Sequence, residues 1–99
     1  MSQQFEWDAA KAIANLKKHG VTFGDALAVF ADPLARIFDD PDHSGDETRE
    51  IIVGHSTERR VLVVGFTERG GRTRIINARG ATARERREYE ENTKKRQGR

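Results

Sequence analysis

The 99-residue chain lacks cysteine and contains only two prolines, one tryptophan and one tyrosine. Without cysteine it cannot form disulfide bonds, a thiolate zinc site or a thiol nucleophile, and this fits a reducing compartment. Its longest apolar run, at 61–64 and extended by Gly65 and Phe66, is far shorter than the roughly 20 residues that cross a bilayer. The N-terminal residues also lack the basic and apolar regions of a secretory signal. We therefore expect a cytoplasmic protein with no membrane span.

Hydrophobic residues make up 35% of the chain and charged residues 34%. A chain of this length buries only about 60–65% of the surface that it exposes when unfolded, so its core has no room for a large cofactor. Chains this short also rarely divide into two domains. We expect one domain over residues 1–99, with a polar tail at 92–99.

The net charge of +2 conceals an uneven distribution of charge along the chain. Residues 1–50 carry 5 Lys and Arg against 10 Asp and Glu, a balance of −5. Residues 51–99 carry 13 against 6, a balance of +7, and 11 of those 13 cations are arginine. Such asymmetry predicts either a polyanionic partner or pairing between an acidic and a basic part of the fold.

The N-terminal residues predict an extended segment and a helix. Residues 4–7 (QFEW) suit a short strand. Asp8 is a good N-cap, the basic residues 17–19 (KKH) suit the C-terminus of a helix, and Gly20 suits the position after it. Apolar residues recur at helical spacing between these ends: Ala9, Ala10, Ile13, Ala14 and Leu16.

A second helix, several strands and a third helix are predicted next. The capping box of Thr22 and Asp25 begins the second helix, and the Asp-Pro pair at 32–33 ends it. Strands are predicted at 34–38, 48–55, 60–67 and 72–79, with an acidic loop at 39–47 and a Gly-Gly turn at 68–72. Another capping box, Thr82 with Glu85, begins the last helix. This order predicts an α+β fold: a small antiparallel sheet of about four strands, two N-terminal helices and one C-terminal helix.

Arginines are concentrated on the last strand, its turn and the last helix: Arg69, Arg72, Arg74, Arg79, Arg84, Arg86 and Arg87. Simple alternation would place Arg72, Arg74 and Ile76 on one face of the strand and Thr73, Ile75, Asn77 and Arg79 on the other. Guanidinium groups match phosphate oxygens, so these residues could follow a nucleic-acid backbone. The alternative, a solvated face held by salt bridges, is favoured for Arg86 and Arg87 and is weaker for Arg74 and Arg79.

The three histidines, His19, His43 and His55, have neither H-x₃₋₅-H nor H-E-x-x-H spacing, so no metal site is predicted. His43 and His55 are interpreted as exposed polar residues. His19 suits a helix C-terminus, and it could equally be a general acid or base. The sequence also lacks the glycine-rich phosphate motifs and the G-x-S-x-G nucleophile motif. The residues alone thus leave RNA cleavage, nucleic-acid binding and protein binding open.

Several segments are distinctive in combination: F-E-W-D from Phe5, N-x-x-K-H-G-V from Asn15, D-P after the second helix, and R-I-I-x-A-R followed by E-R-x-x-Y. Together they resemble the BrnT family of bacterial type II toxins, over about residues 5–90. The resemblance implies a fold similar to the RelE-type ribonuclease toxins, and RNA cleavage that stops translation without a metal or organic cofactor. It also implies neutralisation by a cognate antitoxin with a ribbon-helix-helix part, in a heterotetramer that binds operator DNA.

Matching the family's motifs position by position yields a candidate site for attack of a ribose 2′-OH on the adjacent phosphate. The resemblance implies that Arg74 and Arg79 bind the phosphate and that His19 and Glu85 transfer protons. The RNA-binding residues that it implies are Lys18, Arg49, Arg69, Arg72 and Arg86. For Arg86, and for Tyr89 in the same motif, packing of the last helix is an equally good interpretation.

The chain departs from the family at two positions. The family commonly has Ser where this chain has Asn77, and Tyr where it has Phe66, which has no hydroxyl to offer. Two other functions also stay open: a non-catalytic nucleic-acid-binding module, or a protein that occupies an antitoxin within a DNA-bound repressor. The combination of His19 and Glu85 favours cleavage, because a protein that only binds needs neither.

Overall fold

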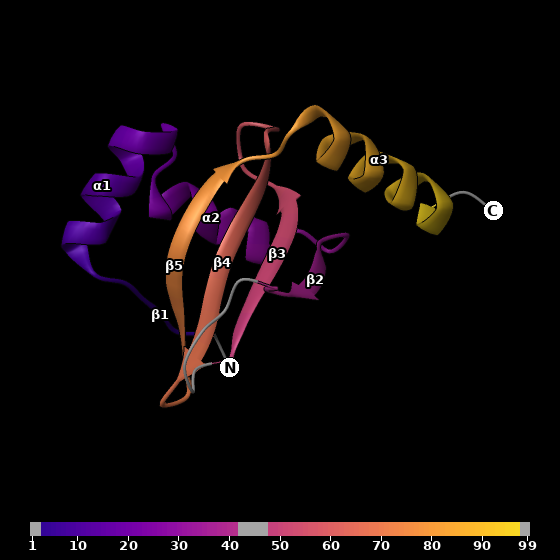
Figure 1. Ribbon diagram of the computed structural model, residues 1–99. Helices are drawn as coiled ribbons and strands as arrows, with labels where there is room; N and C mark the ends of the chain where they lie inside the picture. Colours follow the sequence, from indigo (N-terminus) through magenta and orange to yellow (C-terminus); the bar gives the residue numbers. More distant parts are fainter. Residues whose placement is uncertain (1–2, 42–47, 98–99) are drawn as a thin grey trace.

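The computed structural model describes residues 3–41 and 48–97 (Figure 1). Its elements in chain order are β1 (Phe5–Glu6), α1 (Ala9–His19), α2 (Phe23–Phe30), β2 (Arg36–Asp39), β3 (Arg49–His55), β4 (Val61–Arg69), β5 (Arg72–Gly80) and α3 (Ala83–Gln97). The predicted α+β order, with two N-terminal helices and one C-terminal helix, is confirmed. Most of the predicted acidic loop, including His43, lies outside the described residues.

The strands form one sheet in the order β1-β5-β4-β3-β2. Four of them, β2 to β5, pair antiparallel as predicted. The two-residue β1 adds a parallel pairing with β5, in which Phe5 lies opposite Thr73 and Glu6 opposite Arg74. The central strand is β4, and its residues 61–67 are all buried, which explains why its sequence is apolar on both faces.

The helix starts and the last hairpin follow the predicted local chemistry. The side chains of Asp8 and Thr22 each accept a hydrogen bond from the backbone N–H three residues later, at 3.0 Å and 2.9 Å. Gly70 and Gly71 have φ of 60° and 81°. A two-residue type I′ turn requires positive φ at both positions, and glycine adopts it at little cost. These ends therefore form from interactions within a few residues.

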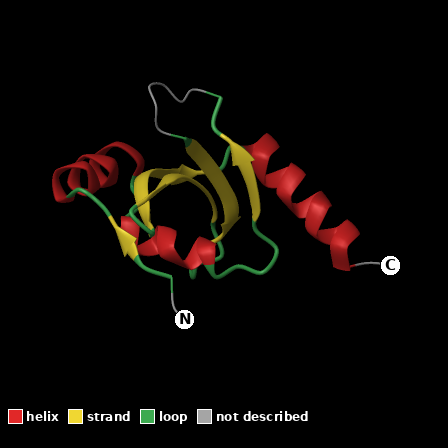
Figure 2. Ribbon diagram, turned by 90° about the horizontal axis from the view of Figure 1, so that it is seen from below, coloured by secondary structure: helices red, strands yellow, loops and turns green. Residues whose placement is uncertain are grey.

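The hydrophobic core lies between α2 and one face of the sheet (Figures 1 and 2). Its buried side chains are Val21 before α2, Phe23, Ala26 and Val29 on α2, and Ile52, Leu62, Val64, Phe66, Ile75 and Ala78 on the strands. Phe30 extends the core toward β1, because its ring meets those of Phe5 and Phe66 edge-on at 5.0 Å and 5.1 Å. Burial of these apolar groups is the main source of stability in such a small fold.

Helix α1 lies beside β5, on the other side of the molecule from α3 (Figures 1 and 2). Two of the apolar residues that give α1 its periodicity are exposed, Ile13 at 63% and Leu16 at 48%. All of α1 is described, and only Asn15 is buried in it. The spacing that predicts the helix therefore does not mark its buried face.

The face of the sheet that α2 leaves uncovered, which we call the open face, carries Arg72, Arg74, Asn77 and Arg79 of β5. Residues 63, 65 and 67 of β4 alternate onto this face, and they lie opposite Arg79, Asn77 and Arg74 respectively. A β-bulge between the last two pairs adds one residue, Ile76, to β5. The extra residue shifts the alternation by one position. The prediction that Arg74 and Arg79 lie on opposite faces is therefore wrong.

The contact of α3 with the rest of the fold is centred on Tyr89, which is 3% exposed. Its hydroxyl donates to Oδ2 of Asp32 at 2.5 Å and lies 3.3 Å from Nδ1 of His55. The Asp32 carboxylate also accepts from the backbone N–H of His55 at 2.8 Å and of Leu34 at 2.9 Å. Burial raises the pKa of Asp32, but these hydrogen bonds outweigh burial and hold the pKa below its usual value. A charged Asp32 thus joins the end of α2, β3 and α3.

Two further predictions concern the C-terminal residues and the exposure of His55. α3 runs to Gln97, so residues 92–97, predicted as part of a polar tail, are helical. His55 is exposed, as predicted. Within residues 3–41 and 48–97, no helix is both long and apolar enough to cross a bilayer.

Replacing Tyr89 with Phe removes one hydroxyl and keeps the ring that packs α3. Because Asp32 loses a donor at a half-buried position, we expect the free energy of unfolding to fall by about 1–2 kcal/mol. Urea denaturation at pH 7 measures this change. Thr93→Val removes a more exposed hydroxyl from the same helix and should change stability by less than about 0.5 kcal/mol. Equal effects of the two substitutions would contradict the anchoring role of Tyr89.

Candidate active site

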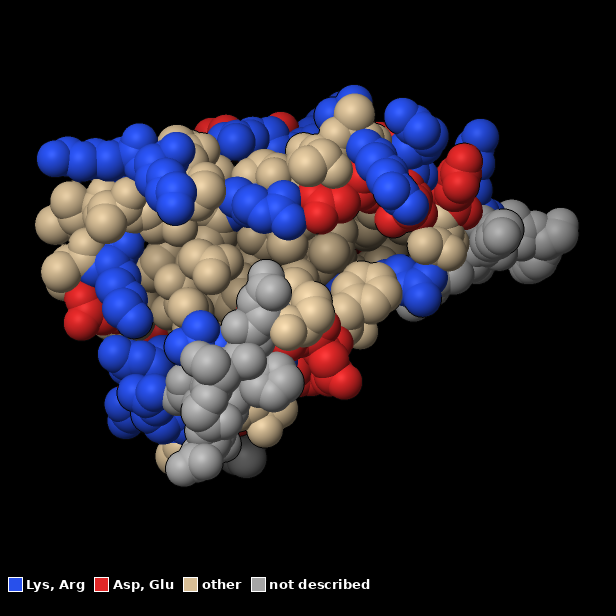
Figure 3. Space-filling model, viewed as in Figure 1, with Lys and Arg blue, Asp and Glu red and all other residues tan. Residues whose placement is uncertain are grey.

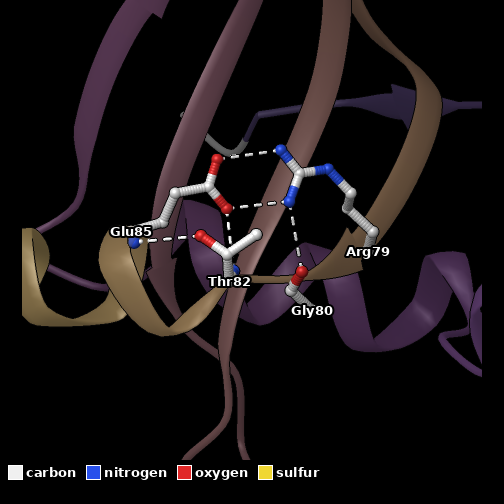
Figure 4. Close-up of polar contacts among 4 residues, drawn as sticks. All are labelled: Arg79, Gly80, Thr82 and Glu85. Atoms are coloured by element: carbon white, nitrogen blue, oxygen red, sulfur yellow. Dashed lines mark hydrogen bonds and ion pairs between the residues drawn. The ribbon is translucent and has the colours of Figure 1, made fainter.

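Arg79, near the end of β5, is held by Glu85 in the first turn of α3 (Figure 4). Its Nη1 donates to Oε1 of Glu85 at 2.8 Å and its Nη2 donates to Oε2 at 2.9 Å. Nη1 also donates to the carbonyl of Gly80 at 3.2 Å. A guanidinium has five N–H donors, and the described residues accept from three of them. The other two, on Nε and Nη2, are available to a ligand, and the side chain is 38% exposed.

The capping box of α3 fixes Glu85 in turn. Oε1 of Glu85 accepts from the N–H of Thr82 at 2.9 Å, and Oγ1 of Thr82 accepts from the N–H of Glu85 at 3.1 Å (Figure 4). The bond from Arg79 is the main reason that the pKa of Glu85 falls from 4.5 to about 2. The same bond raises the pKa of Arg79. At neutral pH Glu85 is therefore a charged, weak base whose geometry suits orientation of Arg79.

A cleft of about 440 Å³ lies between α1 and β5 and reaches Arg79. It is lined by Lys11, Ala14, Asn15, Lys18, His19, Ile76, Asn77 and Arg79. We call it the cationic cleft. Three of the residues assigned from the sequence, Lys18, His19 and Arg79, thus come together from a helix end and a strand end that are 60 residues apart.

Asn15, which sequence reasoning did not select as a site residue, fastens α1 next to Arg79. Its Nδ2 donates to the carbonyl of Ala78 at 2.8 Å and to the carbonyl of Val21 at 3.0 Å, and its Oδ1 accepts from the N–H of Ala78 at 3.1 Å. These bonds hold the last turn of α1, with Lys18 and His19, against β5. The sequence offered one signal for Asn15, which is its place at the start of N-x-x-K-H-G-V. An Asn inside a helix needs hydrogen-bond partners once it is buried.

The structure places Arg49, Arg69, Arg72 and Arg74, which we call the hairpin arginines, at the other end of the sheet. Arg49 and Arg74 flank Thr67 in the strand register, and Arg69 lies opposite Arg72 at the turn. Arg74 pairs with Glu6 at 2.9 Å, and Arg72 lies 3.7 Å from the same carboxylate. Figure 3 shows Lys and Arg gathered over α1 and over this hairpin, with mostly uncharged surface between them.

Arg74 and Arg79 are held by different carboxylates, Glu6 and Glu85. Their partners on β4, Thr67 and Val63, are four positions apart, which is about 13 Å at the usual rise. Arg86 is exposed on α3 and does not line the cationic cleft. The structure therefore groups His19, Lys18, Arg79 and Glu85, and it places the hairpin arginines apart from them.

The two departures from the family fall in different environments. Phe66 is 4% exposed and belongs to the core under α2, so a hydroxyl at this position would not face the cationic cleft. Asn77 lines that cleft. Its amide lies over Gly65, where a Cβ would come within 2.9 Å of Oδ1. Of the two positions, only Asn77 can touch a ligand in the cleft.

The described residues, 3–41 and 48–97, hold no group of three His, Cys, Asp or Glu side chains close enough to share a metal ion.

Comparison with known proteins decides the family. The family described as "Ribonuclease toxin, BrnT, of type II toxin-antitoxin system" matches residues 7–85. The chain belongs to the BrnT family. Its fold is similar to that of the Brucella abortus ribonuclease toxin BrnT, known from a crystal structure, with a TM-score of 0.63 and 23% sequence identity over 82% of this chain and 99% of that chain. No curated protein matches the chain.

The BrnT match covers every residue of the cationic cleft, the hairpin arginines and Glu85. It ends at residue 85, before Arg86 and Tyr89. The family is one of ribonuclease toxins of type II toxin-antitoxin systems, and the predicted resemblance is confirmed. The roles of the individual residues stay predictions.

Glu85→Gln removes the charge that holds Arg79 and keeps the capping box, because Gln also serves at that position. Folding lowers the pKa of Glu85 from 4.5 to about 2. The stabilisation is therefore complete above about pH 4.5 and is lost as the pH falls toward 2. The Glu85 side chain is 33% exposed, so after solvent screening we expect about 1–2 kcal/mol at pH 7.

Denaturation of both proteins at pH 7, 4 and 2.5 measures this contribution. The difference between wild type and Glu85→Gln should be largest at pH 7 and should fall to about a quarter of that value at pH 2.5, because a folded pKa of about 2 leaves most of Glu85 ionised there. Glu90→Gln, at an exposed position of the same helix, is the matched control and should show little difference at any pH. A difference for Glu85→Gln that persists unchanged at pH 2.5 would refute the ion pair.

Proposed function

We propose that this BrnT-family chain is an endoribonuclease that cleaves RNA in the cationic cleft and so stops translation. The observation that carries the proposal is the position of Arg79. Its guanidinium is oriented by Glu85, keeps two donors for a ligand, and lines the same cleft as His19 and Lys18. Cations arranged in advance around a phosphate stabilise the charge that develops in the transition state.

The proposed reaction is an internal transesterification. The ribose 2′-oxygen attacks the adjacent phosphorus and the bond from phosphorus to the 5′-oxygen breaks. The products are a 2′,3′-cyclic phosphate and a free 5′-hydroxyl. The 2′-OH loses a proton and the leaving 5′-oxygen gains one, and His19 is the residue that we assign to proton transfer. Arg79 stabilises the pentacoordinate phosphorus, and Lys18 binds a neighbouring phosphate.

Glu85 receives a positioning role in this proposal. Its carboxylate is paired with Arg79 through both oxygens and has a pKa of about 2. A base with so low a pKa takes a proton poorly near pH 7. The same pair fixes a long side chain before the substrate arrives, which lowers the entropy that binding must remove.

The hairpin arginines are proposed to bind RNA on one side of the scissile phosphate. They lie on the open face with Arg79, and a strand of RNA laid along β5 would reach both places. Phosphate contacts of this kind position the nucleic acid and carry little sequence information. We therefore assign Arg74 to RNA binding, because it lies too far along β5 to act on the same phosphate as Arg79.

We further propose that cleavage needs no metal ion. The described lining of the cationic cleft includes Lys11, Lys18 and Arg79 and no carboxylate. Divalent cations such as Mg²⁺ bind oxygen ligands, mainly carboxylates, and positive charges repel them. The cations of the cleft can stabilise the transition state in place of a metal.

The family is part of toxin-antitoxin systems, and this supports a proposal for partners. We propose that a cognate antitoxin of the ribbon-helix-helix type neutralises the toxin in a heterotetramer that binds operator DNA. We also propose that the toxin acts in the cytoplasm, where its RNA substrate is found.

His19→Ala and Arg79→Ala should each lower kcat for RNA cleavage by about 10²–10⁴-fold and relieve the growth arrest that induction of the wild type causes. The assay uses purified protein and total RNA in the presence of a chelator. Lys17→Ala changes an exposed cation next to the cleft and should retain activity. If the wild-type chain leaves RNA intact, the function is that of a nucleic-acid-binding or antitoxin-partner protein.

Arg74→Ala separates binding from catalysis. We expect a higher KM with kcat nearly unchanged, because the lost contact is made equally in the ground and transition states. The slope of log affinity against log salt should also decrease by about 0.7 for the lost phosphate contact. Arg87→Ala, on the exposed side of α3, is the control. A fall in kcat as large as that of Arg79→Ala would instead place Arg74 at the reacting phosphate.

A further inference from the structure

A second hollow on the open face, of about 550 Å³, lies between the β2–β3 side of the sheet and α3. Its floor is apolar and consists of Phe38, Ile51, Val53 and Val63. Phe38 is 47% exposed, and Ile51 and Val53 are partly exposed. Apolar side chains that are collected in one hollow and rimmed by polar residues give the apolar side chains of a partner a place to pack.

The rim of this hollow is mainly acidic. Glu88 and Glu91 of α3 and Asp39 of β2 line it, next to Glu85, and these four carboxylates outnumber the two arginines of the lining, Arg36 and Arg79. Acidic side chains are visible on the α3 side of this face in Figure 3. We call the hollow the acidic groove. Carboxylates repel phosphates, so the groove does not suit RNA, whereas the cationic cleft on the other side of Arg79 does.

The occupant that fits an apolar floor with an acidic rim is a basic amphipathic segment of another protein. Its apolar side chains would replace water over Phe38 and Ile51, and its Lys or Arg side chains would pair with Glu88 and Glu91. Phe38 lies opposite Ile51 on the neighbouring strand, so the two side chains share this face of the sheet. The charge of the rim thus selects a cationic partner.

We propose that the acidic groove is the docking site for a basic amphipathic segment of the antitoxin. The inference rests on the proposed function, which supplies the antitoxin as partner. Arg79 lines both the groove and the cationic cleft, and Glu85 lines the groove. A segment seated in the groove therefore lies against the ion pair that orients Arg79. Its bulk blocks RNA from the adjoining cleft, and its cations compete for Glu85.

The test measures binding of the purified cognate antitoxin to the wild type and three variants of the full chain by titration calorimetry. Glu88→Lys with Glu91→Lys reverses the rim. Glu58→Lys with Glu90→Lys makes the same change in net charge at exposed positions that do not line the groove. We expect Kd to rise by about 30-fold or more for the groove variant and by less than about threefold for the control. Phe38→Asp, which alters the floor, should weaken binding as well.

RNA cleavage by each variant is measured in parallel, because Glu88, Glu91 and Phe38 have no part in the proposed reaction. The groove variants should cleave RNA at the wild-type rate and resist neutralisation by the antitoxin. Equal antitoxin affinity of the groove variant and the control would overturn the inference. A changed KM for RNA with unchanged antitoxin binding would also overturn it and would show that the groove binds RNA. A dimer of the isolated chain that Phe38→Asp dissociates would overturn it as well, because the groove would then bind a second copy of the chain.

Failure of the proposed function can be distinguished from failure of the docking inference by the activity of the wild-type chain. If the wild-type chain does not cleave RNA but binds the antitoxin, the chain is no ribonuclease, and the calorimetric comparison still decides where the antitoxin docks.

Discussion

The bidentate pair between Arg79 and Glu85 is the contact on which the candidate site depends. It joins the end of the last strand to the start of the last helix, and it lies where the cationic cleft and the acidic groove meet. A long side chain such as Arg loses about 2 kcal/mol of conformational entropy when it is fixed. Here a charge-assisted pair and a helix capping box fix it before any ligand binds.

The composition of α3 explains why polar contacts carry this task. The helix has little apolar surface beyond Ala83 and Tyr89, so hydrophobic burial cannot hold it against the sheet. Glu85 and Tyr89 lie one helical turn apart. Glu85 pairs with Arg79 of β5, and Tyr89 donates to Asp32, which follows α2. With α3 fixed by these two residues, its glutamates border an apolar floor that the helix does not cover.

The charges of the two halves of the chain are mixed in space. Glu6 of the acidic half pairs with Arg72 and Arg74 of the basic half, which is the internal pairing that charge asymmetry allows. Lys11 and Lys18, also from the acidic half, join Arg79 in the cationic cleft. The distribution of charge along the sequence therefore does not predict its distribution over the surface. The cationic cleft and the acidic groove are each lined by residues from both halves of the chain.

Local chemistry in the sequence was enough to predict the order of helices and strands, the caps at Asp8 and Thr22 and the Gly-Gly turn, because each depends on hydrogen bonds within a few residues. The family motifs added His19, Arg79 and Glu85. The tertiary structure alone decided how these are grouped. The bulge at Ile76 moves Arg79 onto the face of Arg74, and Asn15 brings α1 to β5 through bonds across 63 positions. Such contacts arise from packing between distant segments, and no periodicity within one segment encodes them.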